Sequence, residues 1–84
     1  MASATNSITS RIAWCQRQQN LARTQPELEG WRAEEQGLQD ALHYIDQSSQ
    51  YRDCPPDVLK RYAIGFEDGQ ALIRIAWMYL HSPV

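Results

Sequence analysis

The most constraining feature of the chain is a run of ten residues near its C-terminal end, from Ala71 to Leu80, in which Arg74 is the one strongly polar side chain. Side chains on an α-helix are spread at about 100° per residue, so a run of this composition forms a helix that is apolar on more than one side. One apolar side can pack against the rest of a small protein. The other side needs a partner.

The spacing of residues along this helix predicts which side faces the core and which side faces a partner. Positions that alternate by three and four residues are predicted to face the protein's own core: Leu59, Tyr62, Phe66, Gly69, Ile73, Ala76 and Leu80. A second row, on roughly the opposite side, is predicted to bind a partner protein: Ile64, Asp68, Ala71, Leu72, Ile75, Met78 and Tyr79. Gly65 and Gly69 have the spacing that permits close helix crossing. They are predicted to pack against a bulky side chain of the same chain or against a second copy.

Three helices account for nearly the whole sequence, and they are predicted at residues 7–22, 25–47 and 56–81. No segment has the two-residue period of a strand. We therefore expect an all-α protein in which the first two helices form an antiparallel hairpin and the long C-terminal helix packs across or alongside it. Residues 1–84 are predicted to form a single domain, and residues 1–6 a flexible N-terminus.

Local signals define the ends of these helices. Asn6 or Ser7 is the predicted N-cap of the first helix. Thr24 followed by Glu27 is the pattern of a capping box, and Pro26 fits a first helical turn. The third helix opens at Pro55-Pro56-Asp57 and should stop before Ser82-Pro83.

The length of the chain predicts self-association. A chain of 84 residues buries roughly 60–65% of its unfolded surface, which leaves modest stability for a monomer. A helix that is apolar on two sides adds surface that a three-helix monomer cannot cover. We expect a homodimer when no other partner is present.

The titratable residues give no catalytic pattern, so we predict that the protein is not an enzyme. The adjacent carboxylates Glu34-Glu35 and Glu67-Asp68 point about 100° apart on a helix and cannot share one site. Glu35 lies at a core position and is expected to need an arginine such as Arg11 or Arg17 if it is buried. His43 is a single histidine without a supporting motif.

The cysteines and histidines give no metal or cofactor signal. Cys15 and Cys54 are far apart and fit no close-spaced ligand motif, so we expect two reduced thiols and no cofactor. The N-terminal residues lack the basic and apolar regions of a secretory signal, which predicts a cytoplasmic protein. The ten-residue apolar run is about half of what a membrane span needs, so no membrane helix is expected.

Charge argues against nucleic acid as the partner. The net charge is −2, and the arginines of the first helix are spread around it instead of forming one basic face. A DNA-binding regulator that reads with its last helix remains an alternative. So does a structural subunit or co-chaperone of a larger assembly.

In size and helix content the chain resembles the short helical inhibitors encoded by phages and mobile elements, and the small bacterial anti-activators that bind a transcription factor and block its dimerisation. The resemblance is one of class and carries over no residue. It implies a small, non-catalytic regulator that binds another protein and occludes it. The outer side of the last helix is the predicted binding surface.

Overall fold

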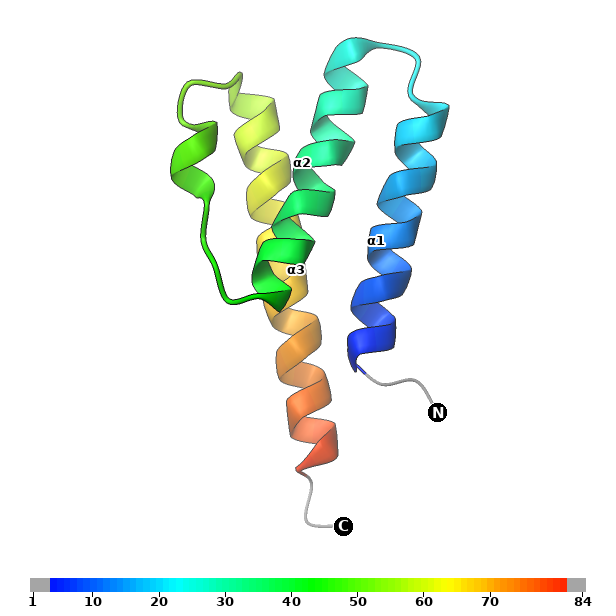
Figure 1. Ribbon diagram of the computed structural model, residues 1–84, viewed down its shortest axis with the longest axis vertical. Coiled ribbons are helices and arrows are strands. Elements are labelled where there is room, and N and C mark those ends of the chain that lie inside the picture. The colour runs from blue at the N-terminus through cyan, green and yellow to red at the C-terminus, as the bar shows by residue number, and fades with distance from the viewer. Residues whose placement is uncertain (1–3, 82–84) are drawn as a thin grey trace.

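The computed structural model describes residues 4–81 and consists of helices throughout (Figure 1). The elements in chain order are α1 (Ala4–Leu21), α2 (Gln25–Leu42), the short 3-10 helix η1 (Ser48–Tyr51) and α3 (Pro56–Leu80). These described residues contain no strand. The prediction of a small all-α, three-helix arrangement is confirmed.

The helices α2 and α3 run in the same direction. Gly30 of α2 lies beside Arg61, and Ala41 near the end of α2 lies beside Gly69. Residue numbers therefore increase in the same direction along both helices. The connection through η1 carries the chain back to the end at which α2 began (Figure 1). α1 is antiparallel to both and packs more extensively on α2 than on α3.

Glycines allow the backbones of α2 and α3 to approach each other closely. A Cβ atom added to Gly65 would lie 2.9 Å from the carbonyl carbon of Glu34 and closer still to its oxygen. One added to Gly37 would lie 2.6 Å from the amide nitrogen of Phe66, and one on Gly69 would lie 2.6 Å from the Ala41 Cβ. Real Cβ atoms essentially never show contacts this short. Gly65 and Gly69 are thus helix-packing residues within the chain.

The start of α2 follows its local signal. Thr24 is the N-cap, and its Oγ1 accepts a hydrogen bond from the Glu27 backbone nitrogen at 3.2 Å. The Glu27 carboxylate in turn accepts from the backbone nitrogen of Arg23 at 3.1 Å, one residue before the position that a capping box uses.

The end of α2 differs from the prediction of residue 47. Tyr44 has a φ of 58°, the left-handed conformation that ends helices. The Tyr44 nitrogen donates to the Ala41 carbonyl at 3.1 Å and the Ile45 nitrogen to the Asp40 carbonyl at 2.9 Å, which is the hydrogen-bond pattern of a Schellman motif. α2 therefore ends at Leu42. Ile45 continued the apolar spacing in sequence but lies outside the helix.

The two chain ends also bear on the predicted boundaries. α1 begins at Ala4, so Asn6 and Ser7 lie inside the helix and neither is its N-cap. Residues 4–6 of the predicted flexible N-terminus are helical, and residues 1–3 lie outside the described part of the chain. α3 ends at Leu80. The predicted stop at Ser82-Pro83 lies outside the described residues.

The core is small and centres on Tyr62, which is buried with Ala33 and Val58. The ring of Tyr51 stacks on that of Tyr62 with their centroids 4.6 Å apart, which attaches η1 to α3. Further buried apolar side chains come from all three helices: Ile8, Cys15, Leu38, Ala41 and Ala76.

One residue predicted for the core lies elsewhere. Leu59, Phe66 and Ile73 of the predicted core row are half-buried, whereas Leu80 is among the most exposed apolar residues of the described chain. Leu80 lies beyond the point where α2 ends, so the continued spacing along α3 has nothing to pack against there.

Candidate functional site

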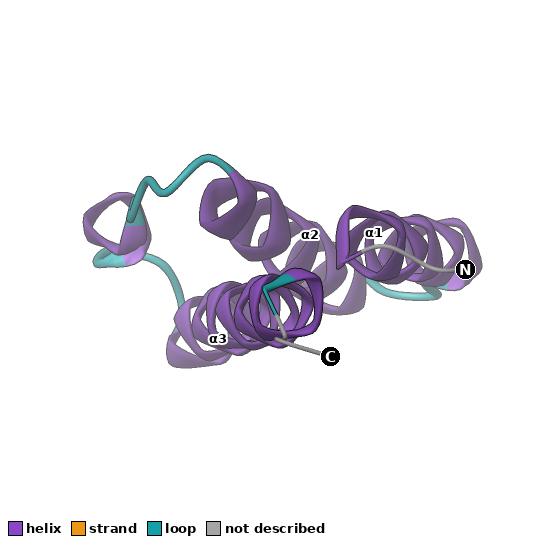
Figure 2. Ribbon diagram, turned by 90° about the horizontal axis from the view of Figure 1, so that it is seen from below, coloured by secondary structure: helices purple, strands orange, loops and turns teal. Residues whose placement is uncertain are grey.

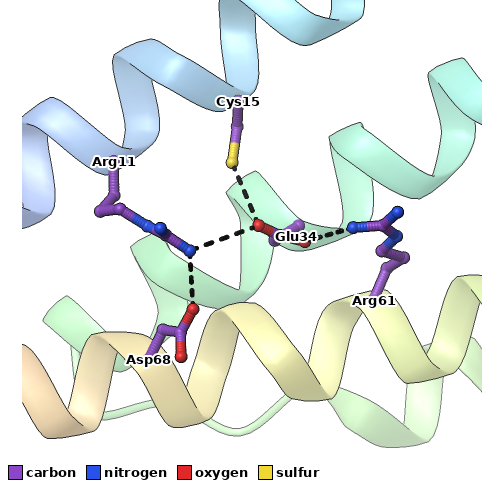
Figure 3. Close-up of polar contacts among 5 residues, drawn as sticks. All are labelled: Arg11, Cys15, Glu34, Arg61 and Asp68. Atoms are coloured by element: carbon purple, nitrogen blue, oxygen red, sulfur yellow. Dashed lines mark hydrogen bonds and ion pairs between the residues drawn. The ribbon is translucent and has the colours of Figure 1, made fainter.

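A buried charge cluster joins the three helices (Figure 3). Glu34 on α2 is 2% exposed, and its Oε1 accepts a hydrogen bond from Arg61 Nη1 of α3 at 3.0 Å. Its Oε2 lies 3.7 Å from Arg11 Nη2 of α1 and accepts from the Cys15 thiol at 3.7 Å. Arg11 Nη2 also lies 2.7 Å from Asp68 Oδ2, so one guanidinium bridges α1, α2 and α3.

Two tryptophans flank the arginines of this cluster. The Arg61 guanidinium lies over the ring of Trp31, 4.4 Å from its centroid, and that of Arg11 lies 5.4 Å from the centroid of Trp14. The two indoles meet edge to face at 4.9 Å. Cation–π contacts and an aromatic pair thus hold both cations beside Glu34.

The contacts of this cluster connect α1, α2 and α3. Burial, reinforced by the charge of Glu34, raises the pKa of the Cys15 thiol to about 12. The thiol stays protonated at neutral pH and is a poor nucleophile. Glu34 is paired with two arginines, Arg11 and Arg61. A buried pair of this kind costs stability when one partner is removed.

The arginine pairing predicted for Glu35 belongs to its neighbour Glu34, so that prediction was wrong. Glu35 is half-buried, and its partners are glutamine amides and not arginines; they come from Gln16, Gln19 and Gln39. Glu34 is buried because it faces α3 beside Gly65. The spacing within α2 does not contain that information, since it depends on where α3 packs.

A second buried carboxylate belongs to Asp40. It accepts hydrogen bonds from the Tyr62 hydroxyl at 2.6 Å and from the amides of Gln36 and Gln47 at 2.8 Å each. The Tyr62 hydroxyl in turn accepts from the Gln47 backbone nitrogen at 2.8 Å. Asp40 thus ties the connection after α2 to α3. Within residues 4–81 no three His, Cys, Asp or Glu residues are grouped as metal ligands would be.

The outstanding surface feature is the end of α3, which we call the apolar tip: Ile75, Trp77, Met78, Tyr79 and Leu80. These side chains are 59% to 71% exposed. Figure 1 shows the last turns of α3 extending past the described ends of α1 and α2. Exposed large apolar side chains that are contiguous indicate an interaction surface.

The structure distributes the predicted protein-binding residues over two environments. Four of them are exposed on α3: Ala71, Ile75, Met78 and Tyr79. Ile64 and Leu72 are half-buried, and Asp68 is half-buried and ion-paired with Arg11. Trp77 and Leu80 belong to the exposed surface as well, and the prediction did not include them. Their signal was the length of the apolar run beyond the last glycine.

A groove of about 420 Å³ adjoins the apolar tip. Its lining comes from the end of α2, the following turn and α3: Ala41, Tyr44, Asp46, Phe66, Gln70, Ile73, Arg74 and Trp77. Trp77 belongs to both the groove and the tip, and its ring stacks on that of His81 at 3.9 Å. The Tyr44 side chain beside the groove is 83% exposed.

No protein-family model matches the chain, and the comparisons with curated proteins and with solved structures found no match either. Among the described residues, no helix has both the length and the apolar character needed to cross a membrane. The function of the protein is therefore inferred from the geometry and chemistry of its own residues.

Proposed function

We propose that the protein is a small, non-catalytic regulator that binds another protein with the apolar tip of α3 and thereby occludes a surface of that partner. The observation that carries the proposal is the exposure of Ile75, Trp77, Met78, Tyr79 and Leu80 within six consecutive positions. Burying one such side chain contributes roughly 1.5–3 kcal/mol. Covering several of them supplies a large driving force for association.

The shape of the tip supports a particular mode of binding. A projecting helix with apolar side chains can enter a hydrophobic groove of a partner, as amphipathic helices do in many regulatory complexes. Aromatic residues dominate the energy of such contacts, and the tip carries Trp77 and Tyr79. Occlusion follows because a groove filled by this helix is closed to the partner's other ligands.

The polar residues support binding and not catalysis. The arginines nearest to a carboxylate, Arg11 and Arg61, are engaged in the ion pairs of the buried cluster. The Cys15 thiol is buried. Cys15 and Cys54 are both free thiols, which suits a reducing compartment, and we place the activity in the cytoplasm.

Site-specific photo-cross-linking in cells tests this function. A photoreactive amino acid at Met78 should yield a discrete adduct with another protein, whereas the same group at the exposed Asp53 should not. The adduct at position 78 should disappear when Leu80→Asp is added, while the helical circular dichroism of the variant is retained. Equal adducts at positions 78 and 53, or none from a folded chain at position 78, would refute the proposal.

A further inference from the structure

The outer side of α3, away from α2, carries a row of side chains that is exposed at Ala71, Ile75 and Met78 and half-buried at Ile64 and Asp68. The row, which we call the outer row, consists of Ile64, Asp68, Ala71, Ile75 and Met78. Figure 2 shows α1 and α2 together on one side of α3. The spacings of four and three residues are those of a helix that pairs with another helix.

Two opposite charges lie along one edge of the outer row. Glu67 and Arg74 are both exposed, and neither makes an ion pair with another described residue. They are seven residues apart, which is two helical turns or about 10 Å. That distance is too long for an ion pair within one helix. Between two copies the same spacing allows two ion pairs, each formed by Glu67 of one copy and Arg74 of the other.

We infer that the outer row pairs with the outer row of a second copy, with the two α3 helices antiparallel and a two-fold axis beside Gln70 and Ala71. The axis lies midway between positions 67 and 74, so each Glu67 faces Arg74 of the other copy. Symmetric contacts of this kind occur twice in a dimer. Charges that flank a row of helix contacts fix orientation and register.

The residues along the row fit this arrangement. Ala71 lies at the axis, where a small side chain permits close approach of the helices. Met78 lies as far beyond the axis as Ile64 lies before it, to within about one residue, so these two side chains meet between copies. Asp68 near the axis is compensated within its own chain by Arg11 at 2.7 Å.

The size of the protein favours a second copy as the occupant. Among the described residues the fully buried large side chains are few, whereas five large apolar side chains are exposed in the last six residues of α3. α3 has 25 residues and a length of about 37 Å, which provides a long interface for so small a chain. A standard interface buries about 800 Å² per partner. This inference rests on the proposed function in taking α3 as the docking helix. Ile75 and Met78 belong to both the apolar tip and the outer row, so the second copy occupies them when the other protein is absent.

Charge reversal with sedimentation equilibrium tests the pairing. The wild type should be a dimer at high micromolar concentration. Glu67→Arg and Arg74→Glu should each weaken dimerisation by about tenfold or more, because each creates two like-charge contacts. The double variant should recover most of the wild-type affinity. Asp53→Arg and Arg52→Glu introduce the same charges at other exposed positions and should leave dimerisation unchanged.

Several results would overturn the pairing. They are a wild-type monomer at that concentration, single reversals without effect, or a double variant as weak as the single ones. Circular dichroism of each variant confirms that the chain is folded. The readout is separate from the cross-link at Met78 to another protein, so failure of this pairing and failure of the proposed function can be told apart.

Discussion

Gly65 is the position at which a single methyl group should separate α2 from α3. In Gly65→Ala the added Cβ would overlap the Glu34 carbonyl group, with the carbonyl carbon 2.9 Å away. The obstacle is backbone and cannot rotate aside. The two helices must move apart by roughly 1 Å before an ordinary van der Waals contact is restored.

The expected change in the free energy of unfolding of Gly65→Ala is the sum of opposing effects. Alanine in a helix interior is favoured over glycine by about 1 kcal/mol. Forcing extra volume into a packed interior costs about 1–3 kcal/mol. Separation of the helices also stretches the Tyr62–Asp40 bond of 2.6 Å and the Arg61–Glu34 bond of 3.0 Å. A weakened hydrogen bond to a buried polar group costs about 1–3 kcal/mol. We expect a net loss of about 2–4 kcal/mol.

The assay is urea denaturation followed by helical circular dichroism, with all variants at one protein concentration. A chain of 84 residues has a free energy of unfolding of about 4–13 kcal/mol, so the loss should be a large fraction of the total. Gly30→Ala is the matched control, because its Cβ would lie 3.4 Å from Arg61 Cγ, a flexible side chain in ordinary contact.

The control should be unchanged or more stable by up to about 1 kcal/mol, because it gains helix propensity without overlap. Two results would refute the reasoning. Gly65→Ala could be as stable as the wild type, or Gly30→Ala could be destabilised to the same extent. Either would mean that the close approach of α2 and α3 at Gly65 does not hold in solution.

Tyr62→Phe should lower the free energy of unfolding by about 1–3 kcal/mol in urea denaturation, because the buried Asp40 carboxylate loses its hydroxyl donor. Burial raises the pKa of the Cys15 thiol to about 12 in the folded chain, whereas the unfolded thiol ionises near pH 9. Between pH 9 and about 12 the unfolded chain therefore binds fewer protons than the folded chain. The free energy of unfolding should fall by about 1.4 kcal/mol per pH unit over that range. In Cys15→Ala that part of the alkaline slope should vanish from denaturation curves measured over the same pH range. Ile75→Asp should keep its helical circular dichroism because Ile75 is exposed, and it should lose association in sedimentation, whereas Leu38→Asp should unfold because it buries an unpaired charge. Unfolding of both aspartate variants would contradict the assignment of Ile75 to the surface.

Features that depend on neighbouring residues could be predicted from the sequence. The N-cap at Thr24 needs only the residues of one turn, and the structure has it. The presence of three helices follows from apolar spacing within each segment. The exposure of Ile75 and Met78 follows from the excess of apolar residues in one short run.

Features that depend on how segments meet could not be predicted. Glu34 is buried and Glu35 is not, because α3 packs against the side of α2 that carries Glu34. The left-handed backbone conformation that ends α2 occurs at Tyr44, and not at the glycine or asparagine that usually indicates it in a sequence. The predicted end of α2 is therefore five residues too late. Antiparallel neighbours are the usual result of short loops, whereas the connection after α2 is long enough to return the chain and make α3 parallel to it.

The parallel arrangement of α2 and α3 explains why a tip is exposed at all. Both helices begin at the same end of the molecule, and Gly30 beside Arg61 sets their register. α2 has 18 residues and α3 has 25, so α3 is longer by seven residues, or about 10 Å. The Ala41–Gly69 contact lies next to the last residue of α2, which leaves the turns after Ile73 without that neighbour. A polar sequence there would be an ordinary solvated helix end. Trp77, Met78 and Leu80 occupy it instead, and their burial requires another molecule.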